Sequence, residues 1–152
     1  MEFRSDTFKG RIEEILALEQ SEKLKNRIFG RLNLQVIECD EEKRLWADYY
    51  YESKEEFLNP YDGVHGGAAC AMADSCMGTT ICASAGELPS TTDISISYLR
   101  PMMGKGYRIH CEIKKTGKTL VACACEISDM ETNALCVTVM GKFILVKKDI
   151  LA

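Results

Sequence analysis

The sequence is poor in proline, histidine and tryptophan: its 152 residues contain three prolines, two histidines and one tryptophan. No Cys-x-x-Cys pair occurs among its eight cysteines. Two histidines and no such pair make a zinc site improbable, so we expect no metal. Positive charge is also scarce, because the formal net charge is −4. We therefore do not expect a nucleic-acid partner.

A long apolar run is missing too. Met1 is followed by charged residues, so we expect no secretory signal. The only stretch long enough to cross a bilayer is rich in Ala, Gly, Ser and Thr and contains Asp74, which argues against a membrane span. The cysteines lie at apolar positions and are expected to be reduced core residues of a cytoplasmic protein. With 46% hydrophobic and 28% charged residues, the composition is that of an ordinary globular protein.

The most informative stretch is 59–86. It opens with turn-forming residues, continues with His65-Gly66-Gly67, and then consists almost entirely of small side chains. The absence of proline permits a helix of about five turns there. Asp74 is the only carboxylate or basic side chain within that helix. A lone acid on an apolar helix is either a buried structural group or a catalytic one.

The helical period assigns the two faces of this segment. Gly67 and Asp74 are seven residues apart and share a face. The residues expected to continue that face are Gly78, Ile81 and Ala85, whereas the face expected to pack on a sheet carries Met72, Cys76, Thr79 and Ala83. Glycine amides at the start of the helix offer unpaired N–H donors and the positive end of the dipole. Such donors can hold a polarised carbonyl oxygen.

The two polar ends of this helix are far apart. His65 and Asp74 are separated by nine residues, or about 13 Å along the axis. One substrate carbonyl cannot touch both ends of the same helix. If they share a site, a second copy of the chain must supply one end, and a twofold dimer with antiparallel central helices would do so.

The remaining segments predict helices followed by a sheet. A helix is expected over 6–20 with Asp6 as its N-cap, and a short one from Ser21 to Phe29. Alternating patterns predict strands over 32–39, 45–53, 91–100, 107–115, 119–128 and 134–146, with a break at 87–90. His110 is expected to be exposed. This order of elements predicts an α+β protein with an antiparallel sheet of about six strands and one long helix on a single face.

The motif His-Gly-Gly with Ala73-Asp74, followed by Thr-Thr-Asp-Ile-Ser-Ile-Ser-Tyr-Leu-Arg-Pro at 91–101, resembles hotdog-fold acyl-CoA thioesterases of the phenylacetic-acid-degradation (PaaI-like) type. The resemblance covers roughly residues 30–146. It implies a curved antiparallel sheet wrapped around a central helix. It also implies a homodimer, alone or as a dimer of dimers. Accordingly, residues 1–30 are expected to form an N-terminal helical extension and residues 31–152 the hotdog domain.

The resemblance also implies roles for individual residues. Asn59 would position the water or the thioester, and Asp74 would be the catalytic carboxylate. His65 and Gly66 match the start of the helix, where a glycine amide polarises the thioester carbonyl. Either Thr91 or Thr92 would orient the carboxylate. We further expect substrate binding by Gly67 and by three basic residues that could meet the phosphates of coenzyme A: Arg100, Lys115 and Lys118.

We therefore expect a cytoplasmic enzyme that hydrolyses acyl-CoA thioesters without metal or organic cofactor. Asp74 would act as general base or nucleophile. His65 is interpreted mainly as a structural residue that fixes the loop. Two alternatives remain open: a non-catalytic acyl-CoA-binding sensor, and a dehydratase acting on 3-hydroxyacyl thioesters. The sequence does not name the acyl group.

Overall fold

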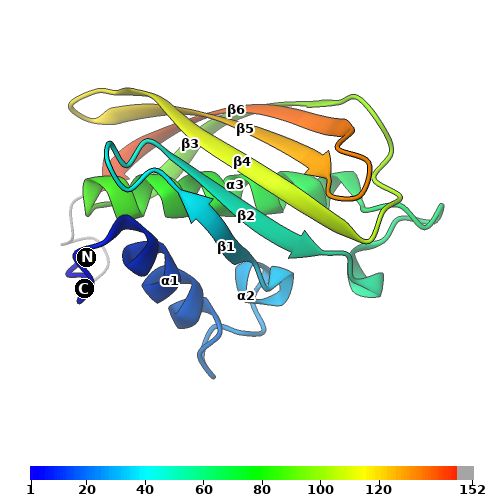
Figure 1. Cartoon of the computed structure of the whole chain (residues 1–152), viewed down its shortest axis with the longest axis horizontal. Helices are drawn as coiled ribbons and strands as arrows, with labels where there is room; N and C mark the ends of the chain where they lie inside the picture. Colours follow the sequence, from blue (N-terminus) through cyan, green and yellow to red (C-terminus); the bar gives the residue numbers. More distant parts are fainter. Residues whose placement is uncertain (147–152) are drawn as a thin grey trace.

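The computed structural model describes residues 1–146 and shows an antiparallel sheet curved over one long helix (Figure 1). The helix, α3, spans Gly66–Ala85. The six strands in this part of the chain are β1 (Gln35–Cys39), β2 (Trp46–Glu52), β3 (Leu88–Tyr98), β4 (Gly106–Thr116), β5 (Leu120–Asp129) and β6 (Leu135–Val146). Their order in the sheet is β1-β2-β4-β5-β6-β3. The predicted α+β hotdog architecture is confirmed, and the end of the expected domain, 147–152, lies outside the described residues.

The helix α3 packs on the sheet through the face that its sequence predicts. Met72, Cys76, Thr79 and Ala83 are all buried. Ile81, expected on the open face with Asp74, is instead fully buried. A helix from the N-terminal segment, α1 (Phe8–Glu19), also packs against α3, and helical periodicity alone cannot show this second cover.

The N-terminal segment differs in detail from the prediction. The N-cap of α1 is Thr7 rather than Asp6, and its hydroxyl accepts from the Gly10 amide. The helix expected from Ser21 to Phe29 is wrong: residues 21–26 form turns, and the short helix α2 spans Ile28–Leu32. A left-handed Asn33 (φ 49°) ends α2 and turns the chain towards β1.

The segment is anchored to the sheet by the turn between β1 and β2. Both carboxylate oxygens of Glu41 in that turn accept backbone amides at the start of α1, from Phe8 (2.8 Å) and Lys9 (2.7 Å). These bonds, the Lys9 amide first, lower the pKa of Glu41. A carboxylate at a helix N-terminus satisfies unpaired amides and the helix dipole. The position of α1 is thus fixed by the two hydrogen bonds to Glu41 as well as by its buried apolar face.

The strand β3 begins earlier than predicted. The expected break at 87–90 is wrong, because β3 starts at Leu88. Gly86 has a φ of 74° and caps α3, so a single left-handed residue suffices to turn the chain from helix into strand. Pro89 is tolerated in β3 because this strand lies at the edge of the sheet.

The cysteines are mostly core residues, as predicted. All eight are free thiols, and six of them are buried: Cys76, Cys82, Cys111, Cys123, Cys125 and Cys136. Burial raises the pKa of Cys123 to about 12, so this thiol stays protonated at neutral pH.

No helix among residues 1–146 combines the length and the apolar character needed to cross a membrane.

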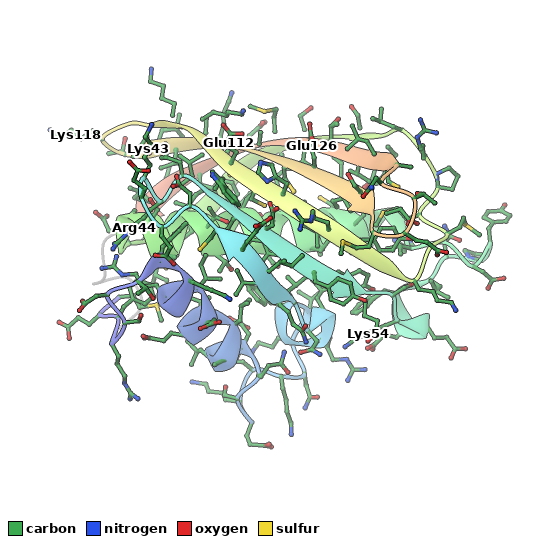
Figure 2. All side chains as sticks on the ribbon, viewed as in Figure 1. Lys43, Arg44, Lys54, Glu112, Lys118 and Glu126 are labelled. Atoms are coloured by element: carbon green, nitrogen blue, oxygen red, sulfur yellow. The ribbon has the colours of Figure 1, made fainter. Side chains whose placement is uncertain are left out.

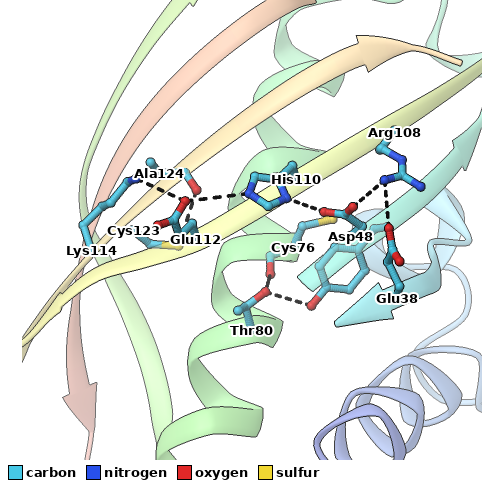
Figure 3. Close-up of polar contacts among 11 residues, drawn as sticks. Glu38, Asp48, Cys76, Thr80, Arg108, His110, Glu112, Lys114, Cys123 and Ala124 are labelled. Carbon is cyan, nitrogen blue, oxygen red and sulfur yellow. Dashed lines mark hydrogen bonds and ion pairs between the residues drawn. The ribbon is translucent and has the colours of Figure 1, made fainter. Parts of the chain in front are cut away.

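A charged cluster lies on the outer face of the sheet, opposite α3 (Figure 3). Asp48 on β2 is only 4% exposed, and Arg108 Nη1 lies 2.6 Å from its Oδ2. His110 Nδ1 hydrogen-bonds the other carboxylate oxygen of Asp48. The expectation that His110 is simply exposed is therefore wrong. The alternation of residues along β4 correctly places His110 on the outer face of the sheet. There its cross-strand partner Asp48 covers it in part.

This cluster should make stability depend on pH. The hydrogen bond to Asp48 raises the pKa of His110 against the opposing effect of burial, and Glu112 adds to the rise. A raised pKa means that stabilisation is complete below the unfolded value of about 6.5 and is lost as pH rises through the folded value. The loss should stay below about 1 kcal/mol, because 38% of the His110 side chain is exposed.

We therefore expect the wild type to lose stability relative to His110→Gln as pH rises from slightly acidic to slightly alkaline. Glutamine can keep the hydrogen bond to Asp48 but does not titrate. Urea unfolding of both proteins across this range measures the difference. A difference in free energy of unfolding that is constant with pH would contradict the assignment.

Candidate active site

The start of α3 is held by His65. Its backbone is extended, its ring caps the helix, and Nδ1 accepts from the Gly67 amide at 2.9 Å. This contact fixes the loop, but it also engages the Gly67 amide that was expected to bind substrate. The Gly66 amide also lies in the first turn and has no acceptor within the helix, so it is a candidate donor at this end.

Asn59 lies in the turn that leads to α3. Its Oδ1 accepts from the amides of Tyr61 (2.9 Å) and Gly63 (3.2 Å), so the side-chain oxygen holds the turn. The Nδ2 amino group remains as a donor. A cavity of about 370 Å³ adjoins Asn59 and Gly66, and Arg100 also lines it. The asparagine, the Gly66 amide and one candidate phosphate ligand thus share one cavity.

Tyr98 is a member of this site that sequence reasoning missed. Its hydroxyl donates to the Gly66 carbonyl at 2.6 Å. A Cβ on residue 66 would lie 3.3 Å from the Tyr98 ring and hydroxyl, so glycine permits this close approach. The strand pattern placed Tyr98 at the end of β3, but only the tertiary structure brings that end to the helix N-terminus.

Asp74 lies on α3 more than two turns further on and pairs with Thr91. The Thr91 hydroxyl donates to Asp74 Oδ1 at 2.7 Å. Thr92 instead donates to the Lys142 carbonyl at 3.0 Å. An irregularity in the pairing of β3 with β6 falls between Thr91 and Asp93. Of the two threonines, Thr91 therefore contacts the carboxylate.

One partly exposed thiol lies a helical turn before Asp74 on α3. Cys70 is half-buried, and desolvation by burial, with a smaller effect of the Asp74 charge, raises its pKa. A thiol held in its protonated form is a poor nucleophile. The group with chemistry to offer on this face of α3 is therefore the carboxylate.

The polar groups of one chain form two separate half-sites. Asn59, His65 and Gly66 lie at the start of α3, and Asp74 with Thr91 lies about 13 Å along its axis. The basic residues expected to bind the phosphates of coenzyme A also lie at two different places. Arg100 belongs to the first half-site, whereas Lys115 and Lys118 are exposed near the hairpin between β4 and β5, with Lys118 at the far end of the molecule (Figure 2). Within residues 1–146, no three His, Cys, Asp or Glu side chains are grouped to hold a metal ion.

Comparison with known proteins gives one family and a consistent set of structures. Residues 61–136, half of the chain, match the model of a family described as the thioesterase superfamily. Zebrafish thioesterase superfamily member 2 is 17% identical, with a TM-score of 0.79, over 93% of this chain and 100% of the other. The search of curated proteins found no match.

Two bacterial structures are also similar. The PaaI protein from the phenylacetic acid degradation operon of Escherichia coli is 16% identical, with a TM-score of 0.75, over 93% of this chain and 97% of the other. A phenylacetic acid degradation-related protein from Ralstonia eutropha is 23% identical, with a TM-score of 0.74, over 89% of this chain and 99% of the other. At these identities the structures show a shared fold.

Proposed function

The chain belongs to the thioesterase superfamily and is a thioester hydrolase, and we propose that it hydrolyses acyl-CoA thioesters with Asp74 as the reacting carboxylate. The observation that carries this proposal is the hydrogen bond from Thr91 to Asp74. It occupies Oδ1 of the carboxylate. Oδ2, which accepts no hydrogen bond from residues 1–146, is then available to water or substrate.

The chemistry follows from these groups. As a general base, Asp74 takes a proton from water while the water oxygen attacks the thioester carbonyl. As a nucleophile, its oxygen attacks directly and forms an anhydride that water then opens. In both routes the carbon–sulfur bond breaks and coenzyme A leaves as a thiolate. It becomes the thiol by taking a proton, from protonated Asp74 in the general-base route and from water in the nucleophilic route. Thr91 holds the carboxylate in position for either route.

The carbonyl oxygen gains negative charge as the tetrahedral intermediate forms. We propose that the Gly66 amide stabilises it, helped by the positive end of α3. Asn59 Nδ2 would position the water or the thioester beside it. The proposed reaction uses no metal and no organic cofactor, since a carboxylate and amide donors supply its acid–base and electrostatic needs.

We further propose that each site combines two chains. The strand β3 is an edge of the sheet, and its eleven residues leave one row of backbone groups unpaired within residues 1–146. A long, exposed edge strand is a template for pairing with another chain. Antiparallel pairing of two β3 strands would set the two α3 helices antiparallel. The start of one helix would then face Asp74 of the other, in a homodimer or a dimer of dimers.

The phosphates of coenzyme A need basic partners. Arg100 lies beside Gly66, so we propose that it contacts them near the thioester carbonyl. Lys115 and Lys118 lie at the opposite end of the subunit, where they could act on the substrate bound to the partner's half-site. The free thiols favour a reducing compartment, and we propose the cytoplasm.

Release of thiol from a panel of acyl-CoA esters tests the proposed function. The wild type is expected to release coenzyme A thiol in step with free acid. A non-catalytic sensor would bind the esters without releasing thiol. A dehydratase would form an enoyl thioester from a 3-hydroxyacyl ester and leave the carbon–sulfur bond intact. Either result would contradict hydrolysis.

A further inference from the structure

A second cavity begins at the Asp74–Thr91 pair. It lies between the N-terminal helices and the second half of α3, and its volume is about 290 Å³. Asp74, Ser75 and Gly78 line it from α3, and the start of β3 lines it from the sheet. A group bound in the part of this cavity beside α3 lies next to the carboxylate to which the hydrolysis is assigned.

The walls away from Asp74 are mostly apolar. The N-terminal segment contributes Ile15, Leu18 and Phe29, and the sheet contributes Leu88 and Phe143. Thr79 also lines the cavity, and its hydroxyl donates to the Ser75 carbonyl at 2.8 Å. The wall therefore suits a group that offers hydrocarbon surface and needs no hydrogen bond.

Gly78 keeps the α3 side of the cavity open. A Cβ at this position would meet only Cγ of Pro89, at an ordinary contact distance of 3.8 Å. Glycine in a helix interior is less stable than alanine, and nothing in the backbone here requires it. The missing side chain leaves volume beside Asp74 that any larger residue would fill.

The opposite wall is a fixed part of the fold. Glu41 holds the start of α1, and Gln20 just beyond its end donates to the Gly30 carbonyl at 2.8 Å. Phe8 and Ile12 of the same helix are fully buried. The N-terminal segment therefore forms a preorganised wall.

From this arrangement we infer that the cavity binds the acyl group of the substrate and that the N-terminal segment sets which acyl groups are accepted. The inference rests on the proposed function, because it places the acyl carbon next to Asp74. The volume is about twice the roughly 150 Å³ of an apolar cavity that takes up benzene. It therefore fits an apolar acyl group: one aromatic ring with its linker, or an alkyl chain of medium length.

Glu19 should disfavour acyl groups that carry a negative charge. Its carboxylate lines the cavity from α1, and burial raises its pKa, partly offset by the charge of Arg27. Asp74 is the second carboxylate in the lining. An acyl group that ends in its own carboxylate would lose hydration against the apolar wall. The two carboxylates of the lining also outnumber its one cation, the Met1 ammonium, which donates to the Gly86 carbonyl at 2.9 Å. Succinyl-CoA should therefore be a much poorer substrate than butyryl-CoA of the same chain length.

The sharpest test is Gly78→Leu, which fills the cavity from the α3 side. We expect the ratio of kcat/KM for hexanoyl-CoA to that for acetyl-CoA to fall by about 100-fold, because four methylene groups lose their apolar contacts. The ratio for phenylacetyl-CoA to acetyl-CoA should fall similarly. The matched control is Ala17→Leu, which adds three of the same four carbons on the exposed side of α1, away from the cavity, and should leave both ratios unchanged.

Widening the cavity from the other wall is a second, independent change. Phe29→Ala should move the preferred alkyl chain to greater length, whether or not Gly78→Leu folds. Gly78→Ala should raise the melting temperature and lower the hexanoyl-to-acetyl ratio only modestly. If Gly78→Leu and Phe29→Ala both keep the wild-type ratios, the acyl group binds elsewhere and the inference is wrong, even though hydrolysis stands.

Binding of thioether analogues, in which the carbonyl is replaced by CH₂, separates this inference from the proposed function. Wild-type protein should bind hexyl-CoA more tightly than ethyl-CoA, and Gly78→Leu should remove the difference. That result supports the cavity assignment even if no ester is hydrolysed. Equal affinities for both analogues in the wild type would overturn it, whatever the enzyme's activity.

Discussion

Replacing Asp74 by asparagine is expected to lower kcat/KM for the best acyl-CoA substrate by about 100-fold or more. Asparagine is nearly isosteric with aspartate and can still accept the hydrogen bond from Thr91. It can neither take a proton from water nor form an anhydride. The loss should therefore fall on the chemical step, with melting temperature and oligomeric state unchanged. Thiol release, thermal unfolding and size-exclusion chromatography measure the three properties.

The matched control is Asp6→Asn, the same chemical change at an exposed position before α1. There the contact with Arg44 is made by the Asp6 backbone carbonyl, so the substitution leaves it intact. This variant should keep wild-type activity. If Asp74→Asn also keeps near wild-type turnover, Asp74 is a structural acid and another group performs the hydrolysis.

The fold was predictable because its pattern is strong and local. The sequence shows a helix of small side chains between a turn and a capping glycine. It also shows the alternation of apolar and polar residues in β4 and β5. Ile81 and His110 were misplaced for a shared reason: periodicity assigns a face but not what covers it. Ile81 is buried in a helix against which α1 also packs, and His110 is half-buried by the cross-strand Asp48.

The candidate site was predictable residue by residue where the motif keeps a fixed spacing. Asn59, His65 and Asp74 lie before or within one continuous helix, so their relative positions follow from the chain. Thr91 and Tyr98 depend on the geometry of β3, whose pairing with β6 is irregular near Thr91. The choice between Thr91 and Thr92, and the contact of Tyr98 with Gly66, therefore required tertiary structure.

Mixing two inactive variants should restore activity if each site combines two chains. The first is Asp74→Asn. The second is Asn59→Asp, which keeps the side-chain oxygen that holds the turn but loses the Nδ2 donor. A heterodimer of the two contains one intact site and one doubly damaged site, so it should approach about half of wild-type activity. Each parental homodimer should be nearly inactive.

A second pairing makes the opposite prediction and serves as the control. The double variant Asn59→Asp/Asp74→Asn, paired with wild type, damages both sites if they are shared between chains. Its heterodimer should then be nearly inactive. If Asn59 and Asp74 instead acted within one chain, this heterodimer would keep one intact site and the first heterodimer would have none. The activities of the two purified heterodimers therefore decide between the arrangements. Because about 13 Å of helix separates the two half-sites in one chain, we expect the shared arrangement.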